Sequence, residues 1–198
     1  MDTTIFQELE DDRVLLRPLQ SSDFEYLKPF SLYEGDLWNF SITSAAGEDN
    51  LRKYIDKAFQ GREVGVEYPF IVFDKLTKQY AGSTRFCDIQ PFHKSLQLGY
   101  TWYGKAFQGT GVNKHCKYLL LEYAFDQLGM ERVEFRAHLE NERSIRAMKS
   151  IGCTEEGVLR SHLVGSTGQR RNSIILSILQ KEWHAGIREM LRQKVYGQ

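Results

Sequence analysis

Residues 96–138 read LQLGYTWYGKAFQGTGVNKHCKYLLLEYAFDQLGMERVEFRAH, and this stretch decides the fold. It begins with a β-rich run at 96–103 and passes through a glycine turn into an apolar-periodic segment that Gly129 stops. A second compact strand pattern follows at 132–138. Strand, glycine turn, helix and strand together predict a βαβ unit.

The glycine turn lies where the first strand passes into the helix. Glycines there let the backbone expose consecutive N–H groups, and the helix start adds a partial positive charge, so the junction favours an anionic ligand. A phosphate-binding P-loop requires G-x-x-x-x-G-K-[ST], but the window from Gly104 to Gly109 continues with Thr110 and Gly111. A dinucleotide fingerprint requires G-x-G-x-x-G, and Lys114 stands in place of its third glycine. The turn therefore predicts neither a nucleotide hydrolase nor a dinucleotide-binding protein.

The segments around this unit predict a mixed sheet with helices packed on it. The predicted strands are 13–19, 68–76, 80–89, 96–103, 132–138, 156–164 and 170–180. The predicted helices are 21–31, 48–60, one that follows the glycine turn to about residue 128, 141–151, and a closing helix from Trp183 with Ile187, Met190 and Leu191 facing inward. This order predicts the α+β (mixed α/β) class, and neither a doubly wound parallel sheet nor a helical bundle.

Length and composition predict a single domain over residues 1–198. No Pro-, Ser- or Gly-rich stretch divides the chain, and 198 residues can bury a substantial core. Lys plus Arg number 26 and Asp plus Glu number 26, so the absence of net charge argues against a nucleic-acid partner. No run approaches the roughly 18 apolar residues that span a bilayer, and the acidic start does not resemble a secretory signal. We therefore expect a cytoplasmic protein without a membrane partner.

The cysteines favour no disulfide framework and no metal site. Cys87, Cys116 and Cys153 are odd in number and widely spaced, and they form no C-x-x-C pattern. Reduced, buried thiols are the simplest interpretation.

Residues 108–113, Q-x-x-G-x-N, differ by one residue from the Q/R-x-x-G-x-G/A signature of the GCN5-related N-acetyltransferase (GNAT) superfamily. Residues 98–160 resemble the C-terminal half of the RimJ/RimL-type ribosomal-protein N-terminal acetyltransferases, and residues 13–27 resemble that group's opening strand and helix. The resemblance implies the GNAT fold, which has a mostly antiparallel six- to seven-stranded sheet, splayed fourth and fifth strands and helices on both faces.

The resemblance also implies the reaction and its participants. A primary amine, on a protein N-terminus or a small molecule, would attack acetyl-coenzyme A (acetyl-CoA) directly in a ternary complex, without a metal. The resemblance is also compatible with a homodimer. The residues that it assigns to the cofactor are Thr101, Trp102 and Tyr103 on the fourth strand, Gln108, Gly109, Thr110, Gly111, Val112, Asn113 and Lys114 in the turn, and Asn141 and Ser144 after the fifth strand. Lys114 or Lys117 is the expected charge partner of the pyrophosphate.

Asn141 and Ser144 are the candidate catalytic residues, because they match the family's N-x-x-S at the head of a helix. In relatives the asparagine lies near the cofactor arm and the serine near the thioester sulfur. The alternative interpretation makes Asn141 a helix N-cap and Ser144 an ordinary first-turn residue. Met148 stands where many relatives carry a proton-donating tyrosine, which leaves Ser144, or a water that it holds, as the substitute.

The sequence does not define the general base. Gln97 stands where relatives often carry a carboxylate, and Glu67 and His138 are candidates that are more simply interpreted as a loop acid and a strand-end histidine. These departures keep open a second hypothesis, a CoA-binding or interaction module of the same fold with reduced catalysis.

Two further features are interpreted structurally. The aromatic residues Tyr100, Trp102, Tyr103 and Phe107 are expected in the core or on the sheet surface rather than in an acceptor groove. Arg170 and Arg171 could meet an acidic peptide, but they are more simply interpreted as the solvated start of the last strand. Asn113 either caps the helix start or reduces cofactor affinity, and the sequence leaves that choice open.

Overall fold

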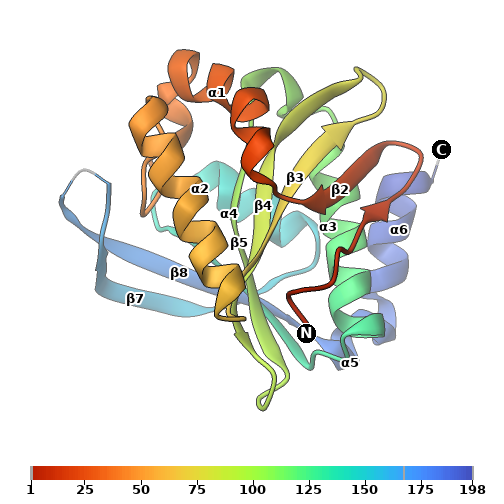
Figure 1. The fold of residues 1–198 in the computed structure, drawn as a ribbon. Coiled ribbons are helices and arrows are strands. Elements are labelled where there is room, and N and C mark those ends of the chain that lie inside the picture. Colours follow the sequence, from red (N-terminus) through yellow and green to blue (C-terminus); the bar gives the residue numbers. More distant parts are fainter. Residues whose placement is uncertain (1, 167, 198) are drawn as a thin grey trace.

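The computed structural model describes residues 2–166 and 168–197 of the chain, which form a mixed sheet flanked by helices (Figure 1). The strands are β1 Leu9–Glu10, β2 Val14–Pro18, β3 Tyr68–Asp74, β4 Gln79–Gln90, β5 Ser95–Tyr103, β6 Arg132–His138, β7 Thr154–Val164 and β8 Arg170–Leu179. The α-helices are α1 Phe24–Tyr33, α2 Glu48–Glu63, α3 Val112–Glu122, α4 Glu142–Ser150, α5 Gln180–Glu182 and α6 Arg188–Tyr196. Short helical turns are η1 Ser21–Asp23, η2 Gly35–Trp38, η3 Lys105–Phe107, η4 Tyr123–Gln127 and η5 Trp183–Ile187.

The strands lie in the order β1-β2-β3-β4-β5-β6-β8-β7. Every neighbouring pair is antiparallel except β5 and β6, which are parallel. That pair is joined by the turn, α3 and η4, because a parallel connection needs a long crossover. The predicted mixed, mostly antiparallel sheet is confirmed, and its eighth strand is the two-residue β1, which is too short to leave a pattern in the sequence.

The parallel pair opens after three residue pairs. Ser95, Leu96 and Gln97 pair with the first residues of β6, and beyond them β5 stays with β4 whereas β6 stays with β8. The predicted splay of these two strands is therefore present. The rest of β5 has an unpaired edge that faces the gap between the strands.

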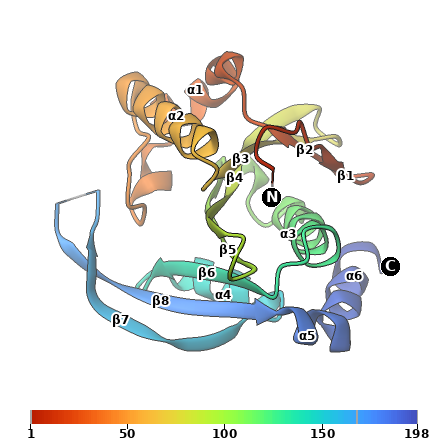
Figure 2. The same cartoon turned by 60° about the horizontal axis from the view of Figure 1, so that its bottom comes forward.

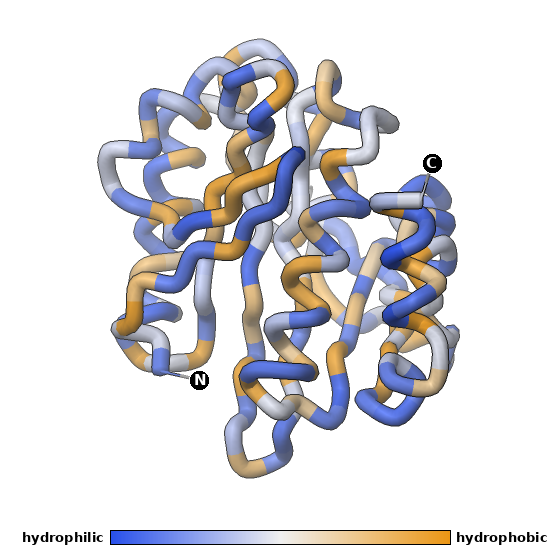
Figure 3. The backbone as a smooth tube through the Cα atoms, turned by 90° about the vertical axis from the view of Figure 1, so that its right-hand side faces the viewer, coloured by the Kyte–Doolittle hydropathy of each residue, from blue (hydrophilic) through white to orange (hydrophobic). Residues whose placement is uncertain are grey.

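Two hydrophobic clusters cover the two faces of the sheet. Successive residues of β3 point to opposite faces, and Phe70 belongs to the cluster under α3 and α6 whereas Ile71 belongs to the cluster under α1 and α2. Figure 2 shows α1 and α2 on the side of the sheet away from α3 and α6. Figure 3 shows apolar stretches along the strands and alternating character along the helices, as amphipathic helices require.

The predicted elements agree with the structure except at a few ends. The closing helical segment begins at Gln180 rather than Trp183, and it contains a π-helical turn at 183–187. Leu191 is buried as predicted, while Ile187 and Met190 are half-buried. The three cysteines are free and buried, as expected. Within residues 2–166 and 168–197, none of the helices has the length and apolar content needed to cross a membrane.

Candidate active site

A cavity of about 590 Å³ opens where β5 and β6 separate. Its walls come from β5, the glycine turn, the start of α3, β6 and the inner face of α4. Its far end is lined by the loop after η2, residues 40–43, and by the β7–β8 hairpin. The cavity thus reaches from the glycine turn, across the splayed strands, to the hairpin.

The glycine turn presents unpaired backbone N–H groups. Gly109 and Gly111 have φ angles of +78° and +96°, a left-handed conformation that favours glycine, and α3 begins directly afterwards. Along α3, the first backbone N–H that donates a hydrogen bond is that of Lys114, which donates to the carbonyl of the N-cap residue Gly111 at 2.8 Å. Among the residues that the structure describes, none accepts a hydrogen bond from the N–H groups of 109–113. This row of donors at a helix start is suited to an anion.

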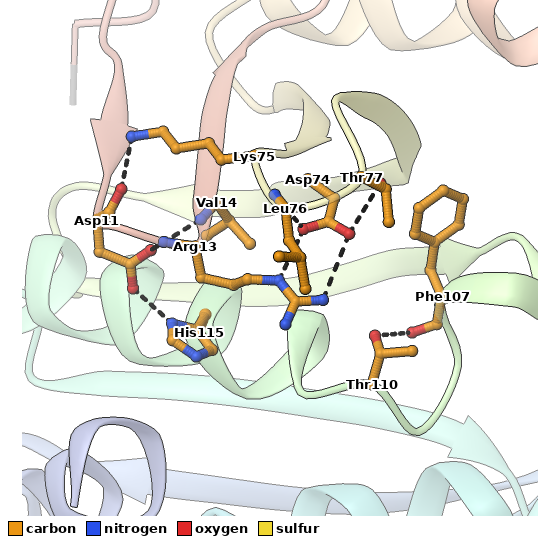
Figure 4. A network of polar contacts seen from close by, with 10 residues as sticks. All are labelled: Asp11, Arg13, Val14, Asp74, Lys75, Leu76, Thr77, Phe107, Thr110 and His115. Carbon is orange, nitrogen blue, oxygen red and sulfur yellow. Dashed lines mark hydrogen bonds and ion pairs between the residues drawn. The ribbon is translucent and has the colours of Figure 1, made fainter.

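Polar side chains hold the turn in place. The Gln108 side chain donates from Nε2 to the Tyr103 carbonyl at 2.8 Å and accepts a hydrogen bond from Arg143 on α4. The Thr110 hydroxyl donates to the Phe107 carbonyl at 2.7 Å (Figure 4). Asn113 makes no side-chain hydrogen bond with any described residue, so side-chain capping by Asn113 is not the reason for its presence.

The edge of β5 carries an irregularity at the cavity. Ser83 pairs with Trp102 and Arg85 pairs with Gly99, so β5 has one more residue than β4 in this interval. Tyr100 sits in the bulge with φ +50°, an uncommon conformation for a non-glycine residue. Such bulges re-aim backbone groups and concentrate near functional sites.

The side chains of this strand end serve mainly the core. Trp102 packs against Trp38 and Phe30 in the cluster under α1 and α2, and Tyr103 is buried in the opposite cluster. Burial raises the pKa of the Tyr103 phenol well above its ordinary value. The aromatic residues pack in or against the two clusters, as expected, but the same four residues, Tyr100, Trp102, Tyr103 and Phe107, also line the cavity, which was not expected.

Lys117 places a buried amine on the cavity wall. Its Nζ donates to the Thr101 hydroxyl at 3.0 Å and lies 5.5 Å from the centre of the Phe135 ring, so it spans the gap between β5 and β6. Only 6% of the residue is exposed, and burial lowers the pKa of its amine from 10.5 to about 8. The exposed Lys114, one turn earlier, is in contrast free to reach a ligand at the glycine turn.

Asn141 and Ser144 lie together at the start of α4. The Asn141 side chain accepts a hydrogen bond from the Ser144 backbone N–H at 3.1 Å, so Asn141 is the N-cap of the helix. Both residues line the cavity, and the Ser144 hydroxyl makes no hydrogen bond with a described residue. Met148 is buried one turn later on the same wall.

The candidate bases occupy different surroundings. Glu67 pairs with the buried Arg85 at 2.6 Å and is absent from the cavity wall, which fits a structural role. His138 lines the cavity at the end of β6, where its Nδ1 accepts a hydrogen bond from the Glu140 N–H and its ring packs against Phe40. Gln97 lies at the last paired position of the splayed strands.

The hairpin end of the cavity contains an arginine that the sequence analysis placed in solvent. Arg171 is 7% exposed and lines the cavity, so that prediction was wrong, whereas its neighbour Arg170 is exposed as expected. Nη1 of Arg171 donates to the Phe40 carbonyl at 2.6 Å. The loop after η2 folds over the arginine, and a contact between residues so distant in sequence leaves no local pattern.

A polar network anchors α3 to the rest of the fold. His115 Nδ1 and the Tyr196 hydroxyl both lie within 2.8 Å of Asp11 Oδ2. The other Asp11 oxygen accepts hydrogen bonds from the backbone N–H groups of Arg13 and Val14 at the β1–β2 turn (Figure 4). Burial raises the pKa of Asp11, but hydrogen bonds, that from His115 foremost, lower it to about 2. Asp11, Asp12 and His115 also bring ligand-type atoms within 4.8 Å of one another, but these hydrogen bonds give the cluster a structural role.

Most of the predicted site residues meet at this cavity. Its wall includes Thr101, Trp102, Tyr103, Gln108, Gly109, Gly111, Asn113, Lys114, Asn141 and Ser144. Thr110 and Val112 do not line it, because the Thr110 side chain turns back to Phe107 and Val112 is buried in the core. The sequence analysis missed Arg143, although it stands inside the quoted N-x-x-S motif, and Arg171.

A mixed sheet that opens between two parallel strands, with an anion-binding turn beside the gap, is the architecture of the N-acetyltransferase fold. Residues 13–154 match the family model described as an acetyltransferase (GNAT) domain. Because the match covers well over half of the chain, this chain belongs to the GNAT acetyltransferase family.

Individual relatives are similar over nearly their whole length. The chain is 25% identical over 179 residues to the Bacillus subtilis (strain 168) protein named "Putative ribosomal N-acetyltransferase YdaF", which covers 87% of this chain and 94% of the relative. It is 24% identical over 178 residues to the spermidine N(1)-acetyltransferase of Escherichia coli (strain K12), covering 87% and 89%. The crystal structure of a GCN5-related N-acetyltransferase from Brucella melitensis superposes with a TM-score of 0.86 at 26% identity, covering 95% of this chain and 85% of that one.

Proposed function

We propose that this chain is an acetyl-CoA-dependent N-acetyltransferase that acetylates a primary amine, with the glycine turn as its pyrophosphate site. The observation that carries the proposal is the row of unpaired N–H groups at 109–113 beside the cavity between the splayed strands. Membership of the GNAT family also supports this proposed function.

The residues on the cavity wall fit the parts of this co-substrate. The N–H groups at 109–113, with Lys114 and Arg143 nearby, suit the two negative phosphates. The edge of β5 at 101–103, which does not pair with β6, suits the amide groups of the pantetheine arm, since an extended chain can pair with a free strand edge. Lys117 and Thr101 supply hydrogen-bonding groups on the wall between these two regions.

The co-substrate supplies an activated acetyl group as a thioester. In the proposed reaction the acceptor nitrogen forms a bond to the acetyl carbon, the carbon–sulfur bond breaks, and a proton lost by the amine ends on the departing thiolate. The chain's part is to align the amine, to donate hydrogen bonds to the developing oxyanion and to manage that proton. The bulged backbone of β5 is our candidate for the oxyanion donor, and the free hydroxyl of Ser144 is our candidate for the proton donor.

A transfer assay tests the proposal. The purified chain is incubated with acetyl-CoA and a panel of free amines, amino acids and N-terminal peptides, and both free thiol and the mass of each acceptor are measured. We expect at least one acceptor to gain an acetyl group with stoichiometric thiol release. Ser144→Ala should lower kcat by about 100-fold at an unchanged KM for acetyl-CoA, as expected for removal of a general acid.

Ser150→Ala is the matched control, because it removes one hydroxyl from the same helix and the same cavity wall, and that hydroxyl is already engaged with the Ala147 carbonyl. It should retain nearly full activity. Tight acetyl-CoA binding without transfer to any acceptor would instead favour a CoA-binding module with reduced catalysis.

A further inference from the structure

None of the Asp and Glu residues that the structure describes lines the cavity. The charged side chains that line it are all cationic or histidine: Lys114, Lys117, Arg136, His138, Arg143 and Arg171. A polycationic acceptor such as a polyamine would bring further positive charge into this enclosure, where no carboxylate is placed to receive it. The lining therefore disfavours a polyamine and raises the question of which anion the cations serve.

Most of these cations already have a partner or an assigned place. Arg143 bonds Gln108 at the glycine turn, and Lys114 lies exposed beside it. Lys117 donates to Thr101, and Arg136 forms an ion pair of 2.6 Å with Glu134. Arg171 is different because its guanidinium is buried and, within the described part of the chain, no side chain bonds it.

Arg171 is also short of hydrogen bonds. Arg171 is more than nine-tenths buried. Within the described residues its side chain makes one hydrogen bond, to the Phe40 carbonyl, and its Nε is buried without a partner. Burial lowers the pKa of this guanidinium, and no neighbouring carboxylate offsets the effect. A buried guanidinium with unsatisfied donors destabilises the fold unless a ligand accepts their hydrogen bonds. A carboxylate is the best match, because its two oxygens can accept two parallel N–H hydrogen bonds.

The position of Arg171 separates it from the glycine turn. It lies on β8 opposite Leu163, close to the tip of the hairpin, and it contacts the loop after η2. Figures 1 and 2 both show the hairpin tip on the far side of the molecule from α3. The phosphates proposed for the glycine turn therefore do not explain this arginine, whereas an acceptor entering the hairpin end would meet it.

We propose that the acceptor is a primary amine that carries a carboxylate, and that Arg171 binds this carboxylate at the hairpin end of the cavity. The proposal rests on the proposed acetyltransferase function and narrows its acceptor. Arg171 is thus a specificity-determining residue, which selects an anionic amine over a neutral or polycationic one.

The test compares acceptors that differ in one carboxylate, with each rate expressed per unprotonated amine, because the carboxylate of L-alanine also raises the pKa of its amine. The first pair is L-alanine and L-alaninamide, and the second is a tripeptide amide with aspartate or asparagine at its second position, which keeps the attacking amine the same. We expect kcat/KM to favour the acid over the amide by about 10- to 100-fold in at least one pair, the range for a charge-assisted hydrogen bond. The pair that shows the preference identifies the carboxylate as that of a free amino acid or of a peptide side chain.

Variants assign the preference to Arg171. Arg171→Gln should lower kcat/KM for the acid to within about threefold of the amide while leaving the amide unchanged, and Arg171→Lys should keep part of the preference. Arg160→Gln is the matched control, since it removes the same charge from an exposed position of the same hairpin and should keep the full preference. Equal losses for acid and amide in Arg171→Gln would reduce the arginine to a support for the loop and overturn the proposal.

Two other results would also overturn it: an equal rate for acid and amide in both pairs, or a higher rate with spermidine than with any acid. If no acceptor turns over, the acetyltransferase function itself fails, and binding then decides the role of Arg171. The Nε–H NMR signal of Arg171, recorded with CoA present, should shift on addition of N-acetylalanine but not of N-acetylalaninamide. An unchanged signal with both would contradict the assigned carboxylate site.

Discussion

At the scale of single residues, Lys117 is unusual for a position on the inner face of a helix. A helix residue that faces the core is ordinarily apolar, but here a lysine that is only 6% exposed places its amine between the two splayed strands, with the Thr101 hydroxyl as its partner. Its ammonium form is disfavoured by burial, which is why the pKa falls to about 8. Such a residue lowers stability near neutral pH, a pattern that is common where function retains a buried polar group.

Lys117→Met should stabilise the fold at pH 7. Protonation of the buried amine opposes folding below the folded-state pKa of about 8, and the shift from 10.5 corresponds to an effect on the order of 3 kcal/mol. Because packing is also altered, we expect a gain of about 1–3 kcal/mol in the free energy of unfolding, measured with urea.

The pH dependence of this gain separates charge from packing. Between pH 8 and 10.5 the unfolded wild type holds a proton on Lys117 that the folded form has lost, so wild-type stability rises with pH relative to the variant. The difference between the two proteins should therefore shrink from pH 7.5 to pH 9.5. The exposed Lys114→Met is the control and should change stability by less than about 0.5 kcal/mol. A pH-independent difference for Lys117→Met would mean that the folded amine keeps its proton up to pH 9.5, as the unfolded chain does, and would contradict the lowered pKa.

At the scale of elements, the glycine turn joins local conformation to binding. Gly111 needs its positive φ to begin α3, and space around it is open, with the His115 ring at 4.0 Å as the nearest neighbour of an added Cβ. Gly129, which ends the helical segment, has a φ of +64° and nothing within 4 Å. The two positions thus share a conformation, but only Gly111 adjoins the unpaired N–H groups and lines the cavity.

Gly111→Glu and Gly129→Glu form a matched pair. Each should lose about 1–2 kcal/mol of stability, because a side chain is strained in the left-handed region. Only Gly111→Glu should abolish acetyl-CoA binding, since it adds bulk and negative charge where we place the pyrophosphate. Calorimetric titration of both variants checks this, and equal affinities would remove the glycine turn from the binding site.

The elements could be predicted from the sequence because their signals are local. Glycines at 111, 129 and 152 begin or end helices, and alternation marks the strands, so the βαβ unit and the meeting of Asn141 with the turn follow from the chain order. The bulge at Tyr100 and the burial of Arg171 could not be predicted. The bulge depends on the register between β4 and β5, and the burial of Arg171 depends on a loop more than a hundred residues away in the sequence. Two consecutive arginines in a sequence look the same whether they begin a strand in solvent or not.

At the scale of the whole molecule, the fold keeps the cavity open at one place in a continuous sheet. The strands on either side are held by separate partners, β4 for β5 and β8 for β6, so the gap does not interrupt the sheet at its paired end. Asp11 ties α3 to the first strands and to α6 through His115 and Tyr196, which fixes the helix that carries the glycine turn. We propose that residues 1–198 behave as one domain, in which this scaffold and the cavity unfold together.

Ligand-dependent thermal unfolding of the wild-type chain tests the central claim most directly. Acetyl-CoA, ATP and NAD are each added at the same concentrations, and the melting temperature is recorded for one cooperative transition. At about 100 times Kd a ligand stabilises the native state by about 2.7 kcal/mol, which for a chain of this size raises Tm by roughly 5–10 °C. The account predicts such a rise with acetyl-CoA alone. A rise with ATP or NAD and none with acetyl-CoA would contradict it.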